Sequence, residues 1–154
     1  MRKILPFILL ICIGFTTVNA QSRGKLEDLI NIKGVSAVLI SKNMLDLIPE
    51  SVMKSETLNL SSVINKIESI IVLNTEQEEA FEVLSREVKN YIKNGKFEII
   101  LFAKDEDESK TTIYSNESKK SGEFILFTED GNELSVVCIV GDLTTKTIKE
   151  LINK

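Results

Sequence analysis

The sequence contains no histidine. Histidine is the commonest general base in enzymes and the commonest metal ligand in proteins, so its absence removes both roles together. Nucleophilic systems that pair serine or cysteine with histidine are excluded as well. A zinc site would depend on carboxylates almost alone, which is a poor ligand set for zinc. We therefore predict no catalytic residues, no metal ligands and no cofactor-binding residues.

Glycine-rich loops and clustered basic residues are also missing. The seven glycines are scattered along the chain, so the sequence has no glycine-rich phosphate loop. The formal net charge is −4, and the basic residues form isolated pairs such as Lys119-Lys120. Nucleic-acid binding needs Lys and Arg gathered into a patch that neutralises phosphates. We therefore predict no nucleic-acid partner.

The first twenty residues have the order of a secretory signal. Arg2 and Lys3 precede an almost wholly apolar stretch, residues 4–15, and Val18-Asn19-Ala20 places small residues where a signal peptidase reads them. The apolar stretch is short for a membrane span. Lipid attachment at Cys12 is a further reading, although lipoprotein signals need a small residue where this chain has isoleucine. We predict cleavage near Ala20 and a periplasmic or secreted protein.

The remaining residues, 21–154, are enough for one domain with one core. Removal of residues 1–20 takes away two of the 19 basic residues and none of the 23 acidic ones, which leaves a net charge of −6. It also removes Cys12, so Cys138 has no partner for an intramolecular disulfide. Cys138 lies within a run of apolar residues, which predicts a buried and unreactive thiol.

Apolar and β-branched residues predict six strands in the mature chain. The six stretches are residues 35–40, 67–73, 97–103, 111–115, 123–128 and 133–140. The gaps between the last four are too short for a parallel crossover, so these strands are expected to form antiparallel hairpins. Asp130-Gly131 is a strong tight-turn signal between the last two.

The clearest helix is predicted to begin at Asn74-Thr75 and to end at Asn94-Gly95, where the glycine supplies a left-handed stop. Thr75 and Glu78 have the spacing of a capping box. The helix has one apolar stripe, formed by Ala80, Phe81, Leu84, Val88, Tyr91 and Ile92. Shorter helices are predicted after Ser41 and over 144–152. These elements predict an α+β fold with two layers, a largely antiparallel sheet with helices packed on one face.

Three local patterns suggest chemistry, and each has a plainer interpretation. Ser51-Val52-Met53-Lys54 matches the S-x-x-K signature of penicillin-binding enzymes, but the companion motifs are absent and the chain is too short for that fold. The acidic run 105–108 offers oxygen ligands for calcium, yet it falls at a predicted hairpin tip, where charges are usually solvated. Strand alternation can place Phe102 or Phe127 on an outer face, although core packing is favoured for both.

The order of the elements resembles a known family. A strand runs into a helix over Gly34–Leu45, the strand 67–73 leads to a long helix and then to Phe97-Glu98-Ile99-Ile100, and the strand that begins at Glu133 ends at Gly141-Asp142-Leu143 before a short helix. Residues 30–152 thereby resemble the small exported proteins of domain-of-unknown-function family 4252, common in Bacteroides-type bacteria. The resemblance implies a location in the cell envelope, and it brings no catalytic residues that could be carried over.

We consider three functions. The favoured hypothesis is a non-enzymatic domain of the cell envelope that binds a protein or small ligand, with the exposed edge of the sheet as the docking place. The alternative is a carboxylate-dependent hydrolase acting on envelope or dietary glycans, because two suitably spaced acids can hydrolyse a sugar without histidine. The third is a structural or homo-oligomeric role.

Overall fold

The computed structural model describes residues 26–47, 61–117 and 121–147. The predicted signal segment 1–20, the Ser51–Lys54 motif and the end of the predicted C-terminal helix lie outside these ranges. Within them, a short 3-10 helix, η1 (Leu29–Asn31), precedes the first strand of the sheet by four residues, and the sheet dominates the fold.

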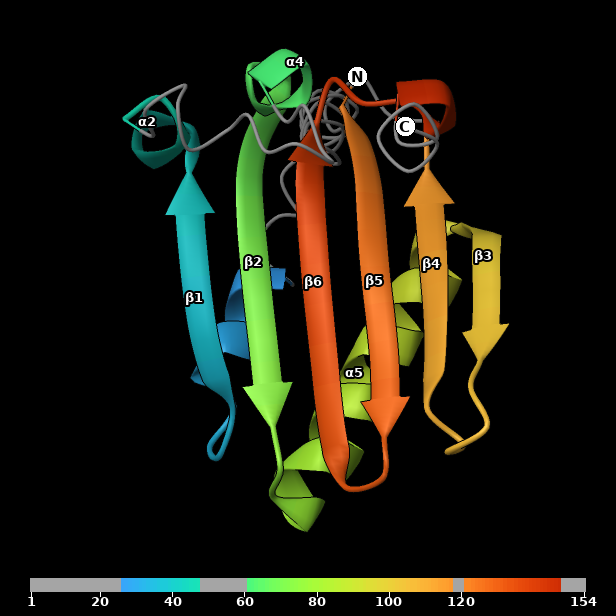
Figure 1. The fold of residues 1–154 in the computed structure, drawn as a ribbon. Coiled ribbons are helices and arrows are strands. Elements are labelled where there is room, and N and C mark those ends of the chain that lie inside the picture. The colour runs from blue at the N-terminus through green and yellow to red at the C-terminus, as the bar shows by residue number, and fades with distance from the viewer. Residues whose placement is uncertain (1–25, 48–60, 118–120, 148–154) are drawn as a thin grey trace, which may run out of the picture.

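Over the described residues the sheet has six strands, and every neighbouring pair is antiparallel. The strands are β1 (Ser36–Ser41), β2 (Ile67–Thr75), β3 (Glu98–Lys104), β4 (Lys110–Asn116), β5 (Gly122–Asp130) and β6 (Glu133–Gly141). All six were predicted from the sequence, and so was the α+β class. The spatial order is β1-β2-β6-β5-β4-β3, so β6 lies between β2 and β5, while β1 and β3 form the two edges (Figure 1).

The long helix α5 (Glu78–Gly95) crosses one face of the sheet (Figure 1). Its predicted apolar stripe is buried or half-buried, and Leu84 and Val88 are completely buried. The polar side, which includes Glu82 and Lys93, is exposed. An amphipathic helix of this kind gains most of its stability from the face that it buries.

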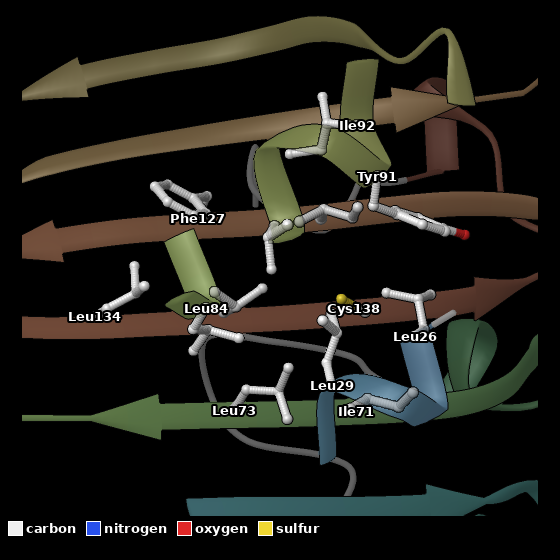
Figure 2. Close-up of a cluster of buried hydrophobic side chains, with 13 residues drawn as sticks. Leu26, Leu29, Ile71, Leu73, Leu84, Tyr91, Ile92, Phe127, Leu134 and Cys138 are labelled. Atoms are coloured by element: carbon white, nitrogen blue, oxygen red, sulfur yellow. The ribbon is translucent and has the colours of Figure 1, made fainter. Parts of the chain in front are cut away.

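The main core lies between α5, the N-terminal segment and three strands (Figure 2). Its 13 buried members are Leu26, Leu29, Ile71, Leu73, Leu84, Val88, Tyr91, Ile92, Ile125, Phe127, Leu134, Val136 and Cys138. The strand residues alternate along β2, β5 and β6, as expected for one face of a pleated sheet. Cys138 is buried among them, which confirms the burial predicted from its apolar surroundings.

A second cluster lies on the opposite face, at one end of the sheet. It is formed by Leu45 of α2 (Lys42–Leu45), Val63 and Ile64 of α4 (Ser61–Ile64), and Phe124 of β5, together with Ile67 and Leu143. Phe124 follows Glu123 and precedes the core residue Ile125, so its side chain points away from α5. The sequence predicted helices on one face; the structure places α5 there, whereas α2 and α4 pack around Phe124 on the other.

The ends of α5 differ from the predicted caps. Thr75 is still paired with Leu134 in the sheet, and Gln77 is the N-cap residue, with no side-chain cap bond. Instead, the Thr75 hydroxyl donates to the carbonyl of Gly34 at 2.8 Å and accepts from the N–H of Gln77 at 3.1 Å. Sheet pairing therefore prevents Thr75 from acting as the predicted cap, and its side chain joins β2 to the start of β1.

At the other end, Lys96 rather than Gly95 adopts the left-handed conformation, with φ 56° and ψ 45°. Gly95 remains the last helical residue, and a Cβ there would overlap the ring of Phe97. The Asn116 amide donates to the Gly95 carbonyl at 2.6 Å, which satisfies one of the open carbonyls at the end of the helix. The glycine is needed for close approach of an aromatic ring, which a turn signal in the sequence does not reveal.

Candidate functional site

The exposed apolar side chains of the described residues gather at the two edges of the sheet. Seven large apolar residues are exposed: Val38, Leu39, Met44 and Leu47 on β1 and around α2, and Ile99, Leu101 and Phe102 on β3. Phe102 and Ile99 are each 62% exposed, and Val38 and Leu39 are 52% and 50% exposed. Single exposed apolar residues are ordinary, but two groups on the edge strands of the described part of the sheet mark surfaces that can bind another chain.

The phenylalanines named in the sequence analysis therefore have different places. Phe127 is buried in the main core, as favoured. Phe102 is exposed on β3, so the favoured core position was wrong for this residue. The reason is tertiary: β3 is an edge strand, and α5 lies against the strands at the centre of the sheet. No signal in the sequence of β3 distinguishes an edge from a central strand, because Glu98–Lys104 is as apolar as the central β6.

The face opposite α5, which we call the outer face, carries a row of apolar residues across all six strands. The strand register places Val38 beside Val72, and Val72 beside Val137. The row continues from Val137 to Leu126, then to Ile113, and ends at Leu101. We call these six residues the apolar row. Its two ends, Val38 and Leu101, are exposed. Of the four residues between them, Ile113 is buried and the other three are half-buried.

A more polar row runs beside the apolar row on the outer face. It consists of Ser36, Asn74, Ser135, Thr128, Thr111 and Ala103, which are paired across the strands in the same way. Thr111 and Thr128 are joined by a hydrogen bond of 3.1 Å between their hydroxyls. Together, the two rows give the outer face a sharp change from apolar to polar along every strand except β3, where Ala103 takes the position in the polar row.

The acidic run 105–108 forms the exposed hairpin tip between β3 and β4, as predicted. The turn is closed by backbone bonds from Asp105 N–H to the Ser109 carbonyl (2.9 Å) and from Glu108 N–H to the Asp105 carbonyl (3.1 Å). The Asp105 carboxylate accepts from the N–H of Glu106 at 2.7 Å. Lys104 lies 3.6 Å from the Glu108 carboxylate. Among the described residues, no group of His, Cys, Asp or Glu side chains has the arrangement of a metal site.

Glu123 is the one buried carboxylate among the residues that the structure describes. It accepts a hydrogen bond of 2.9 Å from the Tyr91 hydroxyl, which comes from the last turns of α5. A glycoside hydrolase of the usual kind needs two carboxyl groups on either side of the scissile bond. The described residues place no second buried carboxylate beside Glu123, so the geometry gives the hydrolase alternative no support.

Burial raises the pKa of the Cys138 thiol from its ordinary value of 9.0 to about 12, and the negative charge of Glu123 contributes to the shift. A raised pKa favours the protonated thiol in the folded state, so this contribution to stability is complete at neutral pH and is lost as pH rises through about 9 to 12. Only the thiolate reacts with alkylating reagents.

We therefore expect folded protein to leave Cys138 unlabelled by iodoacetamide at neutral pH, whereas protein unfolded in urea labels completely. Mass spectrometry of both samples measures the labelled fraction. Rapid labelling of the folded protein at neutral pH would contradict the buried position of the thiol.

None of the described helices is long and apolar enough to cross a membrane. In a comparison with known families, the sequence profile of the family described as Domain of unknown function (DUF4252) matches residues 28–151. Comparisons with curated proteins and with solved structures find no match. The family match covers every described strand and α5.

Proposed function

Because the chain belongs to the DUF4252 family, whose function is unknown, we propose that it is an exported, non-catalytic interaction module of the cell envelope. It binds a polypeptide through the edges of its sheet. The family assignment agrees with the resemblance found in the sequence, and it leaves the activity open.

The observation that carries the proposal is the position of the exposed apolar side chains. All seven that occur among the described residues belong to β1, the α2 region that follows it, or β3. An edge strand offers unpaired backbone N–H and C=O groups, and an extended peptide that pairs with it gains affinity from those groups and specificity from the side chains beside them. Apolar side chains on both edges add the burial that makes such pairing favourable.

The order of residues 1–20 supports export, since it is that of a secretory signal. The absence of histidine from the sequence supports a non-catalytic role, because it removes the commonest acid–base and nucleophile-activating group. The net charge of −6 expected after cleavage would repel the phosphates of nucleic acids, so it favours a protein partner over a nucleic acid.

The test uses affinity capture from the envelope fraction of the producing cells. The β1-edge variant combines Val38→Lys with Leu39→Lys, and the β3-edge variant combines Leu101→Lys with Phe102→Lys. A control variant adds the same charge on the exposed side of α5, through Asn90→Lys with Asn94→Lys. The wild type and the control should retain a specific polypeptide. The amount of that polypeptide retained by an edge variant should be lower by about tenfold or more, because apolar anchors at the centre of an interface carry most of the binding energy.

Two results would contradict the proposal. If both edge variants retain the same proteins as the wild type, the edges are not the binding surface. If the protein is recovered from the cytosol with residues 1–20 intact, it is not exported.

A further inference from the structure

We propose that the occupant of each edge is the other edge of a second copy, so that β3 of one molecule pairs with β1 of the next and the sheet continues from copy to copy. The inference rests on the proposed role of the edges in binding. It commits that role to self-assembly.

With six strands that alternate in direction, the two edge strands β1 and β3 run antiparallel to each other (Figure 1). A second copy placed beside the first, with its α5 on the same side, therefore brings its β1 antiparallel to β3. Along a straight row across an antiparallel sheet, hydrogen-bonded pairs alternate with non-hydrogen-bonded pairs. Because the number of strands is even, the same alternation continues unbroken where β3 of one copy meets β1 of the next, which we call the junction.

The side-chain faces also match. If the apolar row continues into the next copy, Leu101 lies opposite Val38, Phe102 opposite Ala37 and Ala103 opposite Ser36. Leu101 and Val38 both lie on the outer face, and Phe102 and Ala37 both lie on the α5 face. The large exposed ring of Phe102 would then lie beside the smallest apolar side chain of β1. Exposed apolar surface on each edge would be covered by the other.

An irregularity in β3 limits pairing of β3 with itself. The register with β4 shifts between Ile99 and Leu101, which leaves a regular segment of only Leu101–Lys104. In a symmetrical β3–β3 pair, only three residues of each strand can lie opposite one another with their side chains on matching faces of the sheet. Past the irregularity, the extra residue reverses the alternation, so residues from opposite faces would be paired. In the β3–β1 pair, only the regular segment of β3 is needed opposite the start of β1.

Charge favours the same arrangement. The junction places the residues before β1 beside the hairpin tip after β3. Lys33 precedes β1 and is exposed, and the tip carries four exposed carboxylates at 105–108. A β1–β1 pair would instead bring Lys33 near Lys42 of the other copy, and like charges across an interface oppose binding. A β3–β1 contact is also the single contact type that covers both edges, and repetition of such a contact gives rings or filaments.

The experiment measures mass in solution by light scattering and sedimentation, with the protein as recovered from its producing cells and its N-terminus determined by mass spectrometry. We expect the wild type and the Asn90→Lys, Asn94→Lys control to form species larger than a monomer, with mass rising with concentration. The β1-edge and the β3-edge variants should each be monomeric alone. Their equimolar mixture should double in mass, because each variant retains the edge that the other lacks.

A covalent test reports the register without relying on the charged variants. Directly opposed cross-strand residues lie close enough for a disulfide. The double variant Ala37→Cys with Phe102→Cys should give a ladder of disulfide-linked multimers under oxidising conditions. The matched variant Ser36→Cys with Phe102→Cys should not, because its two cysteines lie on opposite faces of the sheet.

The outcomes separate this inference from the proposed function. A monomeric wild type without a disulfide ladder overturns self-assembly. If such a monomer still captures an envelope polypeptide that edge variants lose, the edges bind a different chain and the proposed function stands. A dimer that persists in one of the edge variants alone indicates symmetrical pairing and also overturns the head-to-tail arrangement.

Discussion

Replacement of Leu84 by alanine is expected to lower the free energy of unfolding by about 3 kcal/mol, within the range of roughly 2 to 5 kcal/mol measured for buried leucines. Leu84 is completely buried at the centre of α5 and belongs to the main core (Figure 2). The substitution removes apolar surface from the core and leaves a cavity between the helix and β2, β5 and β6. Domains of this size are typically stable by about 5 to 15 kcal/mol, so the loss is a large fraction of the total.

Urea titration followed by circular dichroism measures this change. The matched control is Glu82→Ala, on the exposed side of the same helix, which should change stability by less than about 0.5 kcal/mol. If both substitutions lowered the free energy of unfolding by a similar amount, α5 would not be packed on the sheet as described. The outer face could then not be identified as the side opposite the helix.

Replacement of Gly141 by alanine is expected to destabilise the protein by about 3 kcal/mol, because overpacking of a tight site costs roughly 1 to 3 kcal/mol and sometimes more. Gly141 is the last residue of β6 and is paired with both Ile67 and Gly122. An added Cβ would overlap the Lys66 carbonyl oxygen and would lie 2.8 Å from the Ile67 Cα. Both neighbours are backbone atoms, so they cannot move aside as a flexible side chain can.

The added methyl group of Gly141→Ala should disrupt one backbone hydrogen bond. The N–H of Asp142 donates to the Lys66 carbonyl at 2.8 Å, and this bond fixes the end of β6 against the start of β2. Separation of the two strands there would also disturb the second core cluster, to which Ile67 belongs.

Gly131→Ala is the matched control for Gly141→Ala. Gly131 has φ +55°, but a Cβ there would meet no atom within 4 Å. The substitution should therefore cost only the strain of a left-handed alanine, about 1 kcal/mol. Urea midpoints measure both. If Gly141→Ala costs no more than Gly131→Ala, the close contact between β6 and the Lys66 carbonyl is not rigid.

Most of the local structure follows from patterns within short stretches. Runs of apolar and β-branched residues identified the six strands, and the stripe from Ala80 to Ile92 identified α5. The short polar gaps identified β3, β4, β5 and β6 as consecutive antiparallel strands, which the register confirms. The family resemblance was also correct, because it rested on the order of these elements.

The helix ends and the position of Phe102 were predicted less well. Thr75 has a capping-box partner in the sequence, but its pairing with Leu134 keeps it in the sheet. Gly95 lies where a left-handed stop is expected, but the ring of Phe97 requires the missing side chain and Lys96 makes the turn. At Thr75 a contact with a residue distant in the sequence overrode the local preference, and at Gly95 the ring of Phe97, folded back onto the helix, did so.

The amino-acid sequence by itself determined which segments form strands and which form the helix, because these choices depend on residues a few positions apart. It also determined that histidine chemistry is unavailable to the protein. The tertiary structure decided that β6 lies between β2 and β5, and therefore that β1 and β3 are edges. This decision depends on pairing between segments far apart in the chain, and it alone turns Val38, Leu39, Ile99 and Phe102 from ordinary strand residues into a surface that another chain can cover.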